Sequence, residues 1–197
     1  MAKKKPLAAP AIVSLLLFFC AASAPAQESR SGSYTKIPTV KGIEMLAAGT
    51  KAPEFAVRDL SDKEFRLKDH GGREPVLLFF WSFFCGPCRD EMPLINKMAK
   101  EYQARGLHVV GVNLDGKEMK KAIVKFTASE KISFRIVFDE LAGDSFAVAD
   151  PYGVAGTPAL FLVDRKGIIS YSVVGAVTAD RLKKEIEKVV KESTFKK

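Results

Sequence analysis

The chain of 197 residues is poor in several residue types, with only three cysteines, two histidines and one tryptophan. It has no internal repeat, no low-complexity tract and no excess of glycine or proline. No arginine-rich block or basic stripe with interleaved aromatic residues is present, which argues against nucleic-acid binding. The two histidines, His70 and His108, stand at spacings that fit no ordinary zinc finger, and we expect no metal site.

The N-terminal segment has the three-part pattern of a secretory signal peptide. Three consecutive lysines precede an apolar run, and small residues close it. We therefore predict that residues 1–26 are a signal peptide and that the protein is exported to the periplasm or another extracytoplasmic compartment. The alternative is a membrane anchor formed by residues 7–24, although this run holds Pro10 and is shorter than the roughly 20 residues of a spanning helix.

Cys20 lies inside this leader, and lipid modification there is disfavoured because Phe19 stands where lipoprotein signals require a small residue. Residues 27–47 are polar and mixed, and we expect a flexible arm before a folded domain over 48–197. The net charge of +8 falls to +5 when the three leader lysines are removed, and the remaining charges of both signs are interleaved.

Apolar periodicity and turn signals predict an α/β domain. We expect a central mixed β-sheet with helices on both faces, preceded by an N-terminal β extension. In the second helix we expect Ala122, Phe126 and Ser129 to share one face. The predicted strands span 54–58, 64–67, 75–82, 107–114, 134–138, 159–163 and 168–174; the predicted helices span 87–105, 117–130 and a last segment from about 178, with a helical turn at 144–150.

The folded part contains two cysteines, Cys85 and Cys88, separated by Gly86 and Pro87. A disulfide across two residues closes too small a loop to stabilise a fold much, so chemistry is the better explanation. Covalent haem attachment requires a histidine directly after the second cysteine, and Arg89 stands there. A pair between a buried strand and a helix start is instead typical of a redox dithiol.

At a helix N-terminus, the partial positive charge of the backbone stabilises a thiolate, which is the attacking species in disulfide exchange. We therefore predict Cys85 as the exposed nucleophile and Cys88, one turn later, as the resolving thiol. Glu91 shares a helical face with Cys88 and is a candidate to take its proton. The alternative is that Glu91, like Asp90, is only a favourable acid in the first helical turn.

In its motifs the chain resembles the TlpA/ResA-type branch of the thioredoxin superfamily, which are exported thiol–disulfide reductases and include cytochrome c maturation proteins. The resemblance implies a thioredoxin fold in which Pro158 is cis and faces the cysteines, and in which the backbone of Thr157 binds the substrate. It also implies that Glu91 corresponds to the family's acidic residue close to the cysteine pair. The matching pieces lie at 52–55, 81–93, 110–112, 152–158 and 161–164, within a match over about 48–191.

The chain departs from the family at Phe84, where relatives usually carry tryptophan, and its Gly86-Pro87 dipeptide is that of thioredoxin itself. Trp81 and Phe84 are candidates for an apolar collar that binds a protein substrate together with Gly86 and Pro87. The core of the domain is the equally weighted alternative for these aromatic side chains.

The favoured function is the reduction of protein disulfides outside the cytoplasm. The protein would use no cofactor, and a thiol protein of the membrane would reduce its cysteine pair again after each reaction. Cytochrome c maturation is one setting implied by the resemblance, and a monomer is expected. A thiol peroxidase of peroxiredoxin type is an alternative, although Leu78 stands where the peroxidase signature has proline. A non-enzymatic docking module is the other alternative.

Overall fold

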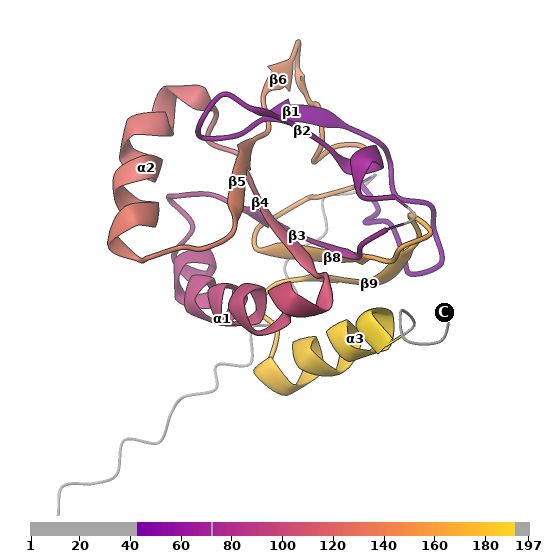
Figure 1. Cartoon of the computed structure of the whole chain (residues 1–197). Coiled ribbons are helices and arrows are strands. Elements are labelled where there is room, and N and C mark those ends of the chain that lie inside the picture. Colours follow the sequence, from indigo (N-terminus) through magenta and orange to yellow (C-terminus); the bar gives the residue numbers. More distant parts are fainter. Residues whose placement is uncertain (1–42, 72, 192–197) are drawn as a thin grey trace, which may run out of the picture. The chain divides into compact units, whose positions relative to one another are not determined.

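The structure, a computed structural model, describes residues 43–71 and 73–191. The predicted signal peptide, Cys20 and most of the predicted arm lie outside these residues. A five-stranded sheet forms the centre of the domain, in the order β5-β4-β3-β8-β9 (Figure 1). Its strands are β3 (Val76–Trp81), β4 (His108–Asn113), β5 (Arg135–Phe138), β8 (Ala159–Val163) and β9 (Ile169–Val174). Strand β3 pairs parallel to β4 and antiparallel to β8, so the sheet is mixed as predicted.

Strand β3 is buried along its whole length, as its continuous apolar run predicts. Because successive side chains point to opposite faces, Leu77, Phe79 and Trp81 join one core cluster, and Leu78 and Phe80 join the other. Both faces of the sheet are therefore packed, and β3 is held in the middle of the domain.

The three α-helices described here all contribute to the first of these clusters: α1 (Gly86–Tyr102), α2 (Lys120–Ser129) and α3 (Ala179–Lys191). The chain steps from β3 to β4 to β5 in one direction across the sheet. Parallel crossovers are right-handed, so two successive steps in one direction place α1 and α2 on the same face. Figure 1 shows α3 beside α1 below the sheet.

The second face is covered differently from the prediction of helices on both faces. Its cover consists of the antiparallel hairpin of β1 (Ala56–Arg58) and β2 (Glu64–Arg66), the short 3-10 helix η1 (Leu67–Asp69), and turns over 147–153. The α/β class and the N-terminal β extension are confirmed, whereas the α-helices of the described residues cover one face only.

One local prediction was wrong. The expected helical turn at 144–150 contains instead the second half of a small hairpin, β6 (Leu141–Ala142) and β7 (Ser145–Phe146), followed by turns. In α2 the buried side chains are Ile123 and Thr127, which lie beside the predicted face of Ala122, Phe126 and Ser129. Short 3-10 helices, η2 (Gln103–Arg105) and η3 (Lys117–Met119), also replace the ends of two predicted α-helices.

Leu46 belongs to the predicted arm of residues 27–47, but hydrogen bonds attach it to the folded domain. The amide of Leu46 donates a hydrogen bond to the Tyr152 carbonyl at 3.1 Å, and the Leu46 carbonyl accepts one from Ser172 Oγ at 2.8 Å. Among the described residues, no helix has the length and apolar character needed to cross a membrane.

Gly111 in β4 allows the close packing of Trp81 at the end of β3. A Cβ at this position would lie 2.7 Å from Ile136 Cδ1 and 3.1 Å from Trp81 Nε1. Contacts under 3 Å are repulsive, so a larger residue would displace the strand neighbours that hold Trp81.

Candidate active site

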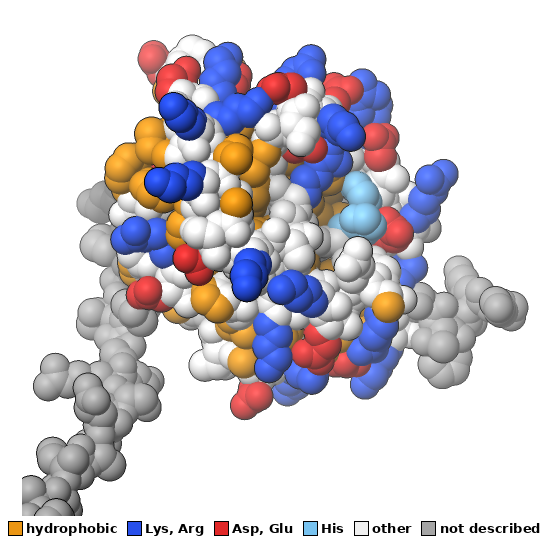
Figure 2. Space-filling view, turned by 60° about the vertical axis from the view of Figure 1, so that its left-hand side comes forward, with side chains coloured by type: hydrophobic (Ala, Val, Ile, Leu, Met, Phe, Trp, Pro, Cys, Tyr) orange, Lys and Arg blue, Asp and Glu red, His pale blue; other side chains and the backbone are white. Residues whose placement is uncertain are grey.

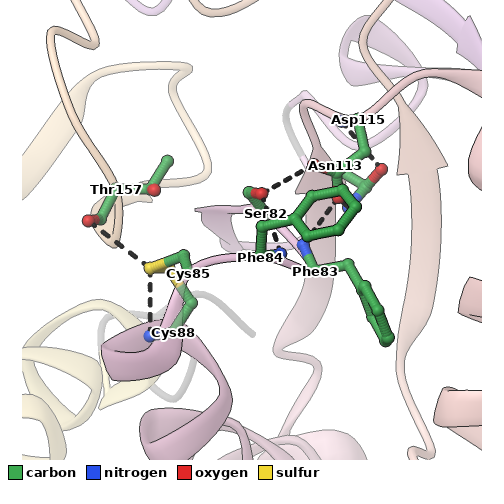
Figure 3. Close-up of a disulfide and its surroundings, with 8 residues drawn as sticks. All are labelled: Ser82, Phe83, Phe84, Cys85, Cys88, Asn113, Asp115 and Thr157. Carbon is green, nitrogen blue, oxygen red and sulfur yellow. Dashed lines mark hydrogen bonds between the residues drawn. A yellow bond between two sulfur atoms is a disulfide. The ribbon is translucent and has the colours of Figure 1, made fainter.

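Cys85 and Cys88 lie where β3 has ended and α1 begins, and they form a disulfide (Figure 3). Cys85 is the N-cap residue of α1 in an extended conformation, and Cys88 lies in the first turn. Cys88 is fully buried, whereas Cys85 is partly exposed. The structure therefore separates the two sulfur atoms into an accessible one and an inaccessible one.

The helix start supplies a hydrogen-bond donor to Cys85. The amide of Cys88 donates to Cys85 Sγ at 3.2 Å, and Pro87, in the first turn, has no N–H to compete for that position. Unpaired amides and the helix dipole at this end favour a negative charge on the cap residue. After reduction, the same geometry lowers the cost of a thiolate on Cys85.

The loop before β8 faces the disulfide. The Thr157–Pro158 peptide bond is cis, as the resemblance implied, and Pro158 is buried. Cys85 Sγ lies 3.6 Å from the Thr157 carbonyl oxygen. Figure 3 shows this carbonyl directed at the sulfur from across the site. The pairing of β8 with β3 sets this approach, because Ala159 directly follows the proline and pairs with Phe80.

Asp115 fixes the loop that leads into Cys85, and sequence reasoning missed it. Its carboxylate accepts hydrogen bonds from Ser82 Oγ at 2.6 Å and from the Phe83 amide at 2.6 Å. Asn113 Nδ2 donates to the same carboxylate at 2.8 Å, and Ser82 Oγ accepts from the Phe84 amide at 3.1 Å (Figure 3). The turn between β3 and α1 is thus held by polar residues that follow β4.

The aromatic residues before Cys85 divide into two groups. Trp81 is fully buried and packs in the core, so we correct its assignment to a substrate-binding collar: no substrate can reach it there. Phe83 is half-buried, lies near Phe126 and has the Arg89 guanidinium 5.9 Å from its ring centre. Phe84 is 72% exposed, and it alone of the two collar candidates is open to solvent.

Gly86 is partly exposed and Pro87 is exposed, beside Phe84 and Cys85. The residues directly beside Cys85 in the chain are therefore apolar, and Phe84 is the one among them with a large side chain. Such a surface suits contact with the backbone of another protein.

Glu91 is buried on α1, one turn beyond Cys88. Its Oε1 accepts a hydrogen bond from the Val177 amide at 2.8 Å, and its Oε2 has no hydrogen-bond partner among the described residues. Desolvation by burial raises the pKa of Glu91 to about 7, although the Val177 hydrogen bond opposes this shift. Glu91 is thus a carboxyl group that can take or give a proton near neutral pH.

The arrangement contains the parts of a dithiol–disulfide exchange site: an accessible sulfur at a helix N-terminus, a buried partner sulfur, and a nearby titratable carboxyl group. Within residues 43–71 and 73–191, no group of three or more metal-ligating side chains includes either cysteine. Of the site residues named from the sequence, the structure places all except Trp81 at or near the exposed side of the disulfide or on the helix that carries it.

Comparison with known proteins gives consistent results. The family model described as the AhpC/TSA family matches residues 48–172. The thiol-disulfide oxidoreductase ResA of Geobacillus thermodenitrificans (strain NG80-2) is 34% identical over 144 residues, which cover 73% of this chain and 79% of that protein. The thioredoxin-like protein YneN of Bacillus subtilis (strain 168) is 36% identical over 143 residues, 72% of this chain and 80% of that protein.

Among solved structures, the thioredoxin domain of a thiol-disulfide oxidoreductase from Bacteroides vulgatus is similar, with a TM-score of 0.64 and 29% identity. The similarity covers 74% of this chain and 99% of that domain. The residues matched by the family model, 48–172, contain the cysteine pair, the loop before β8, and the central sheet as far as the first part of β9.

Proposed function

Because this chain belongs to the AhpC/TSA family, and within it to the ResA-type thiol–disulfide oxidoreductases, we propose that it reduces protein disulfides outside the cytoplasm. The observation that carries the proposal is the placement of Cys85 at the start of α1, open to solvent and facing Thr157, with Cys88 buried behind it.

The reaction has two exchange steps. In the reduced protein the Cys85 thiolate attacks a substrate disulfide, forms a mixed disulfide and releases one substrate thiolate. The Cys88 thiolate then attacks the Cys85 sulfur, which forms the Cys85–Cys88 disulfide and releases the second substrate thiolate. Two electrons pass to the substrate, and the oxidised product is the state seen in the structure.

Glu91 has a proton-handling role in this scheme. Cys88 is buried and must lose its proton before it can attack, and bulk water has poor access to it. Glu91 lies on the same face of α1, and its Oε2 finds no hydrogen-bond partner within residues 43–71 and 73–191. We assign to it the acceptance of the Cys88 proton.

The substrate is a protein with an exposed disulfide. Its backbone is placed to pair with Thr157 beside Pro158, while Phe84 contacts apolar side chains near the disulfide. Gly86 and Pro87 allow a close approach because neither has a long side chain. The exchange occurs between single chains, and we expect the protein to act as a monomer.

Several features support the direction and the setting. Thioredoxin, which shares the Gly-Pro dipeptide between its cysteines, has a reduction potential of about −270 mV and is a reductant. The N-terminal pattern of a signal peptide supports export, with a membrane thiol protein as the electron donor. Apocytochrome c, whose haem-binding cysteines must be reduced, is the substrate we propose first.

The test is a trapping experiment in an exported fraction, with Cys88→Ser and Cys85→Ser variants as a matched pair. Cys88→Ser should accumulate mixed disulfides with substrates because the resolving step is lost, and mass spectrometry of the trapped species identifies the partners. Cys85→Ser should trap nothing. Trapping through Cys88 alone would reverse the two roles.

The same preparations separate the other functions. A peroxidase would consume a hydroperoxide faster than it reduces a protein disulfide, whereas we expect the opposite order. A docking module would keep its function after loss of both cysteines. Acid quenching of cells followed by thiol alkylation should find the pair mainly reduced; a mainly oxidised pair would indicate an oxidant.

A further inference from the structure

Two histidines and a glutamate form a cluster away from the cysteine pair. His70 follows η1, Glu74 precedes β3, and His108 is the first residue of β4. One nitrogen from each imidazole and one carboxylate oxygen of Glu74 all lie within 4.8 Å of one another. In Figure 2 the histidines form one pale-blue patch at the surface, open to solvent.

Both imidazoles converge on one carboxylate oxygen. His70 Nδ1 lies 3.3 Å and His108 Nε2 lies 2.6 Å from Glu74 Oε2. Ligand atoms around a tetrahedral zinc ion are about 3.3 Å apart, given bonds of about 2.0–2.2 Å. The distance from His70 Nδ1 to Glu74 Oε2 already has this value. A small rotation of the half-exposed His108 or Glu74 side chain would lengthen the distance from His108 Nε2 to Glu74 Oε2 to the same value.

Backbone hydrogen bonds bring the three residues to one place before any ion binds, and a ring contact orients His70. The Glu74 amide donates to the His70 carbonyl at 3.1 Å, which closes the turn between them. The His70 ring stacks on Phe65, with ring centres 5.3 Å apart. The His108 amide donates to the Pro75 carbonyl at 3.0 Å as β4 pairs with β3. Ligands fixed in this way lose little freedom when they bind a metal.

We propose that His70, Glu74 and His108 bind one zinc ion, with water completing the coordination. Two imidazole nitrogens and one carboxylate are a common three-ligand set for zinc with an open fourth position. Magnesium and calcium prefer oxygen ligands throughout and are poorly matched to this pair of imidazoles. The side chains are 17% to 44% exposed, so an ion can enter from solvent.

The site lies at the end of the sheet opposite the disulfide. His108 pairs with Val76 at the start of β3, and the cysteines follow Trp81 at its end. Five residues of strand separate these ends by about 17 Å. The ion therefore joins the η1 turn, the start of β3 and the start of β4, and it stabilises the fold without touching the reacting sulfurs.

The same contacts have a second explanation, in which Glu74 simply accepts hydrogen bonds from the two imidazoles. The two explanations differ in what they predict for added zinc. A hydrogen-bonded cluster binds zinc no better than any exposed acid, whereas a three-ligand site binds one equivalent and loses affinity with each ligand removed.

The test is calorimetric titration of the oxidised, untagged chain with zinc chloride. Oxidation removes the two thiolates and the absence of a tag removes added histidines, which would both bind zinc. We expect one equivalent to bind, no binding of magnesium, and a higher melting temperature with zinc. Cobalt should give the intense visible absorption of a tetrahedral site, and this readout requires no variant.

His70→Gln, His108→Gln and Glu74→Gln should each weaken zinc binding at least tenfold and abolish the zinc-dependent rise in melting temperature. Asp69→Asn, an exposed acid beside His70, is the matched control and should bind zinc as the unmodified chain does. The proposal fails if the unmodified chain binds no zinc, if cobalt gives only the weak spectrum of an octahedral ion, or if the glutamine variants bind zinc equally well.

Discussion

At the scale of single residues, Glu91 has the most unusual environment of the site. A carboxyl group in the first turns of a helix ordinarily points to water, where its charge interacts favourably with the helix dipole. Here it is buried against Val177, one of its oxygens has no partner in the part of the chain that the structure describes, and its pKa is raised to about 7. Such an arrangement lowers the stability of the folded protein at neutral pH, and it is typical of a carboxyl group that takes part in a reaction.

Glu91→Gln should slow the resolving step of disulfide exchange and remove an inflection near pH 7 from its rate profile. The amide keeps the size of the side chain and can still accept the Val177 hydrogen bond, but it cannot titrate. The measurement is a stopped-flow pH profile of protein-disulfide reduction. Asp90→Asn, exposed in the same turn, is the control; superimposable profiles for Glu91→Gln and wild type would remove Glu91 from the mechanism.

The same substitution has a thermodynamic signature whose sign follows from the pKa. Because the pKa of Glu91 is raised on folding from 4.5 to about 7, the folded state binds the proton more tightly, and wild-type stability falls as pH rises through this interval. Glu91→Gln should therefore be more stable than wild type above pH 7, by up to about 3 kcal/mol, and the difference should shrink below pH 4.5.

Sequence reasoning at this scale named the cysteine pair that the structure joins in a disulfide, but not its surroundings. Cys85 and Cys88 follow from the motif and its place before a helix. The cis bond at Pro158 came only from the resemblance, because one X–Pro bond in about twenty is cis in folded proteins. The burial of Glu91 could not be inferred from its spacing to Cys88, since it depends on the segment around Val177, which lies 86 residues further along the chain.

At the scale of elements, the turn between β3 and α1 depends on the residues that follow β4. Trp81 and Asn113 are paired at the ends of their parallel strands, so the polar residues after β4 lie beside the turn that carries Cys85. Asp115 then accepts hydrogen bonds from a hydroxyl and an amide of that turn. The position of Cys85 is therefore set by two adjacent strand ends.

Asp115→Ala should lower the free energy of unfolding by about 1–3 kcal/mol, because buried donors lose a charged acceptor. It should also speed hydrogen exchange at the Phe83 amide and slow disulfide reduction. Asp115→Asn keeps one acceptor and should give intermediate values. Denaturant unfolding and amide exchange by NMR measure these effects.

The matched control is Asp144→Ala, which removes an exposed aspartate at the β6–β7 turn. It should leave all three quantities unchanged. Wild-type exchange at the Phe83 amide in Asp115→Ala would show that another contact holds the turn.

Most elements could be predicted because their patterns are long and regular, as in β3, α1 and the amphipathic α3. The short hairpin of β6 and β7 could not, because two-residue strands carry no periodicity. The sequence does not select the buried face of α2, because apolar residues occur on more than one side of it, and in the structure Ile123 joins the core cluster. Asp115 carries a weak signal, a polar residue directly after a buried strand, which becomes informative once the strand order is known.

At the scale of the whole molecule, the proposal that the reaction occurs outside the cytoplasm depends on the predicted leader. The chain has one apolar run near its N-terminus with a positive start and small residues at its end. If residues 1–26 are removed, the mature protein begins at Gln27 with a net charge reduced by three.

Mass spectrometry of the protein from an exported fraction should therefore give a chain that starts at Gln27. The physical reason is that the apolar run is shorter than a membrane-spanning helix requires and is followed by a small-x-small cleavage site. Fractionation supplies the control: a full-length chain found with the membranes would instead support an anchor over 7–24, and a lipid on Cys20 would support a lipoprotein.

The global fold was predictable because its motifs cover nearly the whole domain, but contacts between distant segments were not. His70 and His108 are 38 positions apart, and in the sequence each is an isolated residue. Only the pairing of β4 with β3 brings them to one carboxylate. That pairing, together with the parallel pairing of β5 with β4, places α1 and α2 on one face of the sheet, which the sequence pattern leaves open.

The protein contains a single tryptophan, and it lies in the core cluster that also includes Cys88. Its indole is fully buried and its Nε1 has no hydrogen-bond partner among the described residues. Light emitted by this indole therefore comes from one apolar environment close to the redox pair, with no other tryptophan to obscure it. A disulfide quenches a nearby excited indole, so opening the Cys85–Cys88 bond is visible as a change in intrinsic fluorescence, without any label.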